Sequence, residues 1–113
     1  MYEYRAVIRS VHDGDSFRAD IDLGFGVILR DQPLRVALID APELGTDAGR
    51  AARDYLRTLL PTGCEVVIRT VKDRREKYGR LLAQITGLDG VDVTTLLIAA
   101  GHAKPWDGQG PRP

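Results

Sequence analysis

Cysteine is nearly missing from this sequence and asparagine is wholly missing, since Cys64 is the single cysteine among 113 residues. One thiol excludes an internal disulfide and fits a reducing compartment. Without asparagine there is no acceptor for N-linked glycosylation. No apolar run approaches the length of a membrane span, and the first ten residues lack the apolar stretch of a signal peptide. We therefore expect a cytoplasmic protein with no membrane partner.

An excess of charge of either sign is also missing, because 16 Lys and Arg residues balance 16 Asp and Glu residues. This balance excludes the overall electrostatic footprint of a strong duplex binder. The charges are uneven, however, with six basic residues against two acidic ones between positions 69 and 80. The segment is either a solvated loop or a local patch for a polyanion. The patch would consist of Lys72, Arg74, Arg75 and Lys77.

Alternating apolar residues dominate the first forty positions and predict β-strands. Strands are expected over residues 4–11, 17–23 and 27–30, and again over 34–39 after a turn at 31–33. Within 17–23, the shared and buried face is predicted to carry Phe17, Ala19, Ile21 and Leu23. Residues 65–71 and 80–86 predict two further strands around the charged segment.

A helix is predicted between the third and fourth strands, because apolar residues recur at helical spacing over residues 48–60. Asp47 is its expected N-cap, and Pro-Thr-Gly at 61–63 ends it. A short helix over 93–100, capped by Asp92 and ended by Gly101, follows the fifth strand. Residues 1–104 are expected to form one domain, and the Gly/Pro-rich residues 105–113 a loose tail. The pattern indicates an α+β, mainly β protein built on a small, closed or nearly closed barrel.

The stretch VHDGDSF at 11–17 places two aspartates at a turn between strands. Asp15 has the parity of Phe17 and should point to the buried face, where a carboxylate needs a cation, a metal or a donor. Asp13 lies in the turn itself, where an aspartate that accepts backbone N–H groups is common. An EF-hand is excluded, because its third ligand position would be Phe17 and its closing glutamate Gly24.

Arg35 lies in an otherwise apolar run, Leu34 to Ile39, and is costly to bury unless it meets an anion. The anion is either a nearby carboxylate, such as Asp40 or Glu43, or a phosphate held in a two-pronged grip. A second arginine closes the motif KYGR at 77–80, which read alone is a charged hairpin turn. Together, the carboxylates and the two arginines are the groups that metal-assisted hydrolysis of a phosphodiester requires.

Taken in order, DGDS at 13–16, RVALIDAPE at 35–43, KYGR at 77–80 and AAGHA at 99–103 resemble the staphylococcal (thermonuclease, or micrococcal) nuclease family. The resemblance covers roughly residues 4–104, and several motifs in family order are more specific than any one alone. It implies a five-stranded OB-fold barrel, with a helix between strands 3 and 4 and a short helix after strand 5. It also implies a monomer that cleaves DNA and RNA with Ca2+.

The resemblance implies a role for each matching residue. Asp15 and Asp40 match the two metal-binding aspartates, and Ala41 matches the position that supplies a backbone carbonyl ligand. Glu43 matches the carboxylate usually assigned as the base that activates water. Positions that match the family's phosphate contacts are Arg35 and Arg80, which neutralise charge on the phosphoryl group, and Tyr78, which binds a terminal phosphate.

The sequence also departs from the family pattern. The lysine-rich loop after the glutamate is reduced to residues 44–47, and the family's C-terminal helix is missing from a chain that ends at Pro113. The tyrosines that stack on a base are replaced by Trp106 as the nearest candidate. Two other functions remain open: a non-catalytic nuclease-like OB-fold module that binds nucleic acid or protein ligands, and a small-molecule phosphodiesterase.

Overall fold

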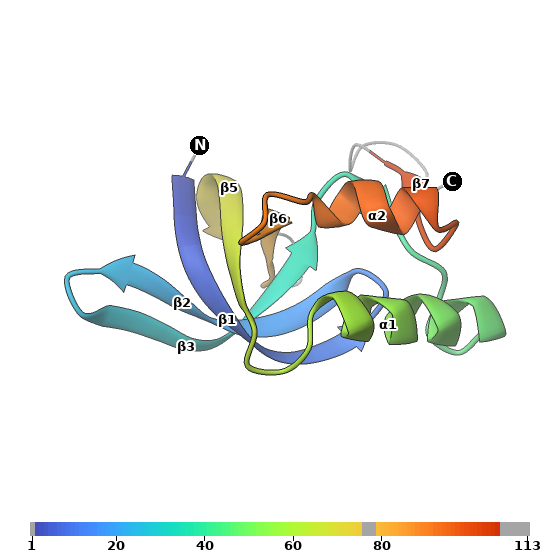
Figure 1. Ribbon diagram of the computed structural model, residues 1–113, viewed down its shortest axis with the longest axis horizontal. Coiled ribbons are helices and arrows are strands. Elements are labelled where there is room, and N and C mark those ends of the chain that lie inside the picture. Colours follow the sequence, from blue (N-terminus) through green and yellow to red (C-terminus); the bar gives the residue numbers. More distant parts are fainter. Residues whose placement is uncertain (1, 76–78, 107–113) are drawn as a thin grey trace.

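A computed structural model describes residues 2–75 and 79–106 (Figure 1). Strands and helices follow one another as β1 (Tyr2–Asp13), β2 (Ser16–Gly24), β3 (Val27–Val36), β4 (Ile39–Asp40), α1 (Asp47–Leu59), β5 (Glu65–Arg75), β6 (Leu81–Gly87), α2 (Val93–Ala99) and β7 (Lys104–Pro105). The two helices lie at the same end of the molecule, and the β2–β3 hairpin projects at the other (Figure 1). Neither helix, at 13 and 7 residues, is long and apolar enough to cross a membrane.

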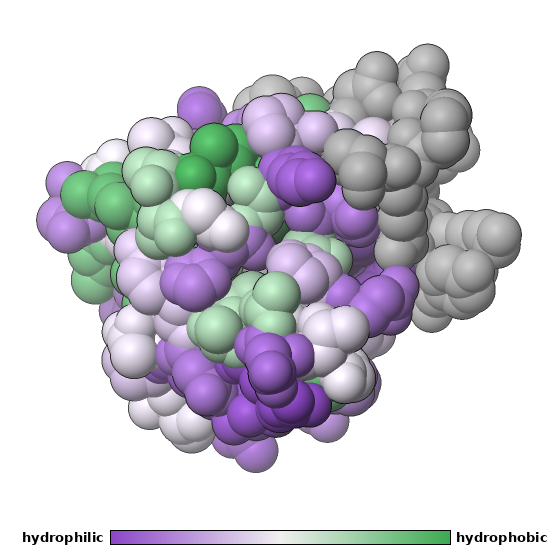
Figure 2. All heavy atoms as spheres, turned by 90° about the vertical axis from the view of Figure 1, so that its right-hand side faces the viewer, coloured by the Kyte–Doolittle hydropathy of each residue, from purple (hydrophilic) through white to green (hydrophobic). Residues whose placement is uncertain are grey.

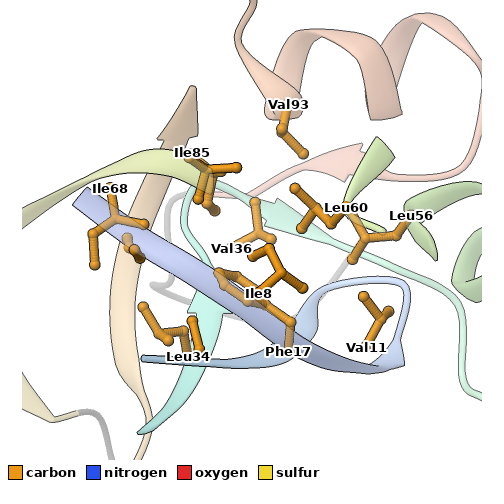
Figure 3. Close-up of a cluster of buried hydrophobic side chains, with 14 of the residues drawn as sticks. Ile8, Val11, Phe17, Leu34, Val36, Leu56, Leu60, Ile68, Ile85 and Val93 are labelled. Atoms are coloured by element: carbon orange, nitrogen blue, oxygen red, sulfur yellow. The ribbon is translucent and has the colours of Figure 1, made fainter. Parts of the chain in front are cut away.

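Five strands form a closed barrel in the order β1-β2-β3-β6-β5, because β5 pairs with β1 as well as with β6. The β3–β6 pair is parallel and the other pairs are antiparallel. Phe17, Ile8 and Leu34 fill the barrel, and Leu56 and Leu60 approach it from the α1 side (Figure 3). The predicted five-stranded barrel with a helix between β3 and β5 is therefore confirmed.

The predicted face of β2 is buried at Phe17, Ala19 and Ile21, whereas Leu23 is exposed because the hairpin runs beyond the barrel. The expected turn at residues 31–33 is wrong, because β3 continues through it. Asp31 adopts a positive φ of 50°, and the pairing with β2 shifts register there, so the chain bulges without reversing. The true turn comes later, at residues 37–38, and separates β3 from β4.

Thr46, not Asp47, is the N-cap of α1. Its Oγ1 accepts the Gly49 N–H at 3.0 Å, while Asp47 lies in the first turn. The Thr46 hydroxyl also donates to the Glu43 carbonyl at 2.7 Å, and the Thr46 N–H donates to the same oxygen at 3.1 Å. The cap therefore ties the backbone of Glu43 to the start of the helix.

Two glycines allow α1 to approach the neighbouring loops closely. A Cβ on Gly49 would lie 1.8 Å from the Glu43 carbonyl oxygen, and a Cβ on Gly14 would lie 2.8 Å from the Ala52 Cβ and 2.9 Å from the Ala41 Cβ. The first contact sets the position of Glu43 against α1. The second packs the β1–β2 turn between α1 and Ala41. Hydrophilic side chains cover the outer face of α1, in the lower part of Figure 2.

The last described residues, 104–106, pair with β4 and the turn before it, whereas residues 107–113 of the expected tail lie outside the described part of the chain. Asp92 caps α2 as predicted, accepting the Thr95 N–H at 3.2 Å. Beyond α2, β7 pairs with β4 through Ile39 and Pro105. The Trp106 N–H then donates to the Leu38 carbonyl at 2.9 Å, so the chain is fastened to the turn that follows β3.

Candidate active site

A cavity of about 210 Å³ brings together five of the predicted site residues from distant parts of the chain. It lies between the β1–β2 turn, the end of β3, the segment before α1 and the start of β6. The described residues that line it are His12, Asp13, Asp15, Arg35, Ala41, Pro42, Glu43, Leu44 and Arg80. Asp40 does not line the cavity but is linked to it through Arg35.

Asp15 is buried at the mouth of β2, as its strand parity predicted, with 8% of the residue exposed. Its Oδ2 accepts the Ala41 N–H at 3.1 Å and contacts Arg35 Nη2 at 3.4 Å. Burial, with a further contribution from the neighbouring Asp13, raises the pKa of Asp15 to about 6 against the opposing effect of Arg35. The site therefore holds a desolvated carboxylate that one guanidinium does not fully neutralise.

Asp13 forms the turn that the sequence predicted for it. Its Oδ1 accepts the backbone N–H of Asp15 at 3.1 Å. Burial raises the pKa of Asp13, but hydrogen bonds from Asp15 and Ser16 outweigh this effect and leave the pKa below its ordinary value. Asp13 therefore holds the turn in place and adds negative charge beside Asp15.

Arg35 is buried at the end of β3, with 5% of the residue exposed. The turn at residues 37–38 folds around its guanidinium, which donates to the carbonyls of Val36 at 3.4 Å and Ile39 at 3.1 Å. The turn also brings Asp40 Oδ1 to 3.6 Å from Arg35 Nη2. Asp40, one of the two carboxylates that the sequence predicted as partners of Arg35, is therefore a partner, and Asp15, in the turn just before β2, is a second one.

Arg80 reaches the site through Ser16, a residue that the sequence analysis did not single out. Arg80 Nη1 donates to Ser16 Oγ at 3.0 Å, and Ser16 donates to Asp15 Oδ1 at 3.3 Å. The sequence signal that could have identified Ser16 is its position next to Asp15 in the DGDS motif. His12, on the other side of the same turn, also lines the cavity and was likewise missed.

Glu43 is exposed and lines the cavity opposite the β1–β2 turn. Its backbone carbonyl accepts a hydrogen bond from Thr46, as described above, so the backbone from which the Glu43 side chain extends is held in place. Ala41 is held from the other side by its N–H bond to Asp15. The short segment Ala41–Leu44 is therefore anchored at both ends, and the arrangement can present a carboxylate to a molecule in the cavity.

The three predicted metal ligands, Asp15, Asp40 and Ala41, all lie in the described part of the chain. Among the described residues, no group of three or more His, Cys, Asp or Glu side chains is arranged to hold a metal ion. The predicted set contains two carboxylates, Asp15 and Asp40, which both contact Arg35. Trp106 lies with its ring centroid 5.3 Å from the Arg35 guanidinium carbon, a cation–π distance. Its role in base stacking stays a prediction.

The predicted substrate patch falls on the end of β5 and on the segment that follows it. Lys77 and Tyr78 lie outside the described residues. Lys72, Arg74 and Arg75 belong to β5, whose backbone is described there. Their contacts with substrate stay a prediction.

Comparisons with known proteins agree with this geometry. The model of the family described as "Staphylococcal nuclease homologue" matches residues 33–110, a span that includes Arg35, Asp40, Glu43 and Arg80. Endonuclease YhcR of Bacillus subtilis (strain 168) is 30% identical over 115 residues, which cover 92% of this chain and 9% of that protein. A protein of Escherichia coli O157:H7 named "Uncharacterized endonuclease" is 36% identical over 70 residues, covering 62% of this chain and 44% of that protein.

The chain thus spans less than half the length of either relative, and what those proteins do as wholes is a property of longer chains. The family match nevertheless extends over more than half of the present sequence. It coincides with a closed five-stranded barrel in which Arg35, Glu43 and Arg80 surround one cavity. The chain belongs to the staphylococcal nuclease family.

Proposed function

We propose that this protein is a Ca2+-dependent nuclease that hydrolyses phosphodiester bonds of DNA, RNA or both. The observation that carries the proposal is the cavity of about 210 Å³ on which Asp15, Arg35, Glu43 and Arg80 converge. A carboxylate able to accept a proton faces two guanidinium groups able to bind a phosphate, and this combination suits phosphodiester hydrolysis.

The donor set fits a hard divalent cation. Asp15 and Asp40 provide carboxylate oxygens beside a single buried guanidinium, and burial is the main reason that the pKa of Asp15 is raised. Oxygen ligands of this kind suit Ca2+ better than Zn2+. Asp15, Asp40 and the Ala41 carbonyl would hold the ion, which when bound supplies positive charge to the phosphoryl oxygens.

The protein's own residues would then divide the work. Glu43 would take a proton from a water molecule as the water oxygen attacks phosphorus, while the bond from phosphorus to one sugar oxygen breaks and that oxygen takes up a proton from solvent. Arg35 and Arg80 would bind the equatorial oxygens, where negative charge grows toward the transition state. Arg35 is already oriented by two backbone carbonyls, and Arg80 by Ser16, so little reorganisation is needed.

A plasmid-nicking assay with Ca2+, and with excess EGTA, tests the proposal. We expect cleavage only with Ca2+, and we expect Glu43→Gln to reduce it at least about a hundredfold while the protein stays folded. The matched control is Glu65→Gln, which removes an exposed glutamate paired with Arg5 on the barrel surface. Cleavage that persists in EGTA would reject the metal assignment. Nucleic-acid binding without any cleavage would show instead a non-catalytic module.

A further inference from the structure

The β2–β3 hairpin carries an aromatic residue that the barrel core does not use. The hairpin projects from the end of the molecule opposite the two helices (Figure 1). Gly24 of β2 pairs with Val27 of β3. The two residues between them, Phe25 and Gly26, form a tight turn with φ values of 57° and 76°. Phe25 is fully exposed (105%), so its ring adds nothing to the buried core.

Phenylalanine is also unfavourable for the turn itself. Two-residue turns with positive φ at both positions favour Asn-Gly or Asp-Gly, because a short polar side chain or none tolerates the left-handed region. A bulky residue with positive φ is a backbone outlier and costs free energy in the isolated chain. Phe25 therefore stabilises neither the core nor the turn, which points to a contact outside the monomer.

A hollow that can hold an aromatic ring lies at the base of the same hairpin. Its volume is about 300 Å³, and we call it the barrel mouth. The described residues that line it are Tyr4, Ile21, Leu23, Leu29, Ile68, Thr70 and Leu81. Leu29 pairs with Ile21, and Tyr4 pairs with Ile68, so these side chains share the inward face of the barrel. Because a cavity of roughly 150 Å³ can bind benzene, the barrel mouth has room for a phenyl side chain.

The separation of the hairpin tip from the barrel mouth allows two copies to fit each other. Phe25 lies four residues from both Ile21 and Leu29, which is about 13 Å along the hairpin at the rise of a β-strand. When two hairpins lie antiparallel, the tip of each lies beside the base of the other. A two-fold axis near Leu23 and Val27 therefore places both Phe25 rings over the opposite barrel mouths at once. Such an isologous contact closes as a dimer.

The charge and the area of this surface suit weak self-association. The chain has 16 basic and 16 acidic residues, so two copies do not repel each other through net charge. Two buried aromatic rings and the equal areas that they cover come to roughly 600–1,000 Å². Leu23, Val27 and Leu29, which are 37%, 50% and 38% exposed, add further apolar area. The total approaches the lower end of the roughly 1,200–2,000 Å² of specific interfaces.

We propose that the hairpin tip and the barrel mouth form a self-association surface through which two copies of this chain build a dimer. Phe25 of each copy inserts into the barrel mouth of the other copy. The catalytic cavity lies near α1, at the opposite end of the molecule, so both cavities stay accessible in the dimer (Figure 1). This dimer does not depend on the nuclease function, and it departs from the monomer that the family resemblance implies.

Sedimentation velocity tests for the dimer. From about 1 to 300 µM, we expect the sedimentation coefficient of the wild-type protein to rise with concentration, because an interface of this size is a weak one. Phe25→Ala should weaken the dimer at least tenfold. Leu88→Asp is the matched control, since Leu88 is 62% exposed in the turn after β6 and does not line the barrel mouth. A wild-type protein that stays monomeric, or a loss in Leu88→Asp equal to that in Phe25→Ala, would overturn the dimer.

A mixture of two defective variants tests the geometry. Phe25→Ala keeps the barrel mouth but lacks the ring, whereas Leu29→Glu keeps the ring but places a carboxylate in the mouth. Neither should self-associate, but the mixture restores one of the two contacts. In spectra of ¹⁵N-labelled Phe25→Ala, the amide signals of Tyr4 and Ile68 should therefore shift when unlabelled Leu29→Glu is added. Unlabelled Phe25→Ala should cause no shift. Leu23→Glu serves as the second mouth variant if Leu29→Glu does not fold.

The results also separate a second copy from other occupants. If the amide signals do not shift in the mixture, Phe25 does not enter the barrel mouth and the proposed dimer is wrong. If wild-type protein stays monomeric but floats with vesicles of phosphatidylcholine and phosphatidylglycerol, and Phe25→Ala does not, the hairpin tip binds a lipid surface instead. That outcome would also overturn the dimer.

Discussion

Gly49→Ala is the substitution at which two opposing effects can be weighed most directly. In an ordinary helix interior, replacing glycine with alanine stabilises by about 1 kcal/mol, because alanine has the higher helix propensity. Gly49 is buried in the first turn of α1, and a Cβ there would lie 1.8 Å from the Glu43 carbonyl oxygen. Real Cβ contacts are essentially never below 3.0 Å, so the helix and the loop must separate by about 1 Å.

The steric effect should win. Overpacking typically costs about 1–3 kcal/mol, and this clash is with backbone, which no change of rotamer relieves. After subtraction of the propensity gain, the free energy of unfolding should fall by up to about 2 kcal/mol, which lowers Tm by up to roughly 8 °C. A shift of about 1 Å in the loop that carries Glu43 should reduce kcat about a hundredfold, because misplacement on this scale is costly in a preorganised site.

The control separates stability from positioning. Ala51 is exposed on the same helix, and Ala51→Gly should cost about 1 kcal/mol through propensity alone while leaving activity intact. Thermal melts and a nicking assay are run on both variants at a temperature where both are folded. If Gly49→Ala melts higher than wild type and keeps its kcat, the close approach of α1 does not position Glu43, and the reasoning is refuted.

Three further predictions concern the cap, the second arginine and the buried carboxylate. Thr46→Ala should lower stability by about 1 kcal/mol and also weaken cleavage, whereas Thr46→Ser should retain both in melts and assays, because serine can make the same two hydrogen bonds. Arg80→Ala should reduce kcat at least about a hundredfold, and Arg80→Lys should restore little, because a point charge does not reproduce a two-pronged grip; near-wild-type kinetics in Arg80→Lys would contradict this. The third prediction is made for protein in EDTA. Because the pKa of Asp15 is raised, the folded state keeps a proton that the unfolded state releases. Asp15 should therefore lower the free energy of unfolding progressively as pH rises from about 4 to about 6, by at most about 3 kcal/mol. Denaturant melts of Asp15→Asn should therefore show a gain over wild type at pH 7 that vanishes near pH 4.

Much of the barrel followed from strand periodicity. The alternation in β2 predicted the burial of Phe17, Ala19 and Ile21, and the same parity placed Asp15 inward. Period-2 patterns carry this information because one face of each barrel strand must be buried. The prediction failed at Leu23, since periodicity does not show where a hairpin leaves the barrel.

Features that depend on contacts between segments were not predictable from local sequence. Pro33 suggested a turn, but β6 pairs with β3 only from Leu34 onward, so the missing N–H of Pro33 costs no ladder bond on that side. Thr46 and Asp47 are both good capping residues. In the structure the cap is Thr46, whose hydroxyl and N–H both donate to the carbonyl of Glu43, three residues earlier.

Arg35 shows why the two arginines differ as tests of the mechanism. Register pairs Arg35 with Ser16, which lies 19 residues earlier in the sequence, and this pairing brings Asp15 to the Arg35 guanidinium. Removing Arg35 would leave Asp15 and Asp40 without that cation, and breaking a buried pair in this way typically costs about 3–5 kcal/mol. That is a large part of the roughly 5–15 kcal/mol that stabilises a small domain. We therefore expect Arg35→Ala to lose both its cooperative melt and its activity, so the inactive variant would say little about catalysis.

Arg80 is half-buried and bonds to the Ser16 hydroxyl, so Arg80→Ala should melt within a few degrees of wild type. A collapse of the fold in Arg80→Ala would show that this arginine, too, is structural.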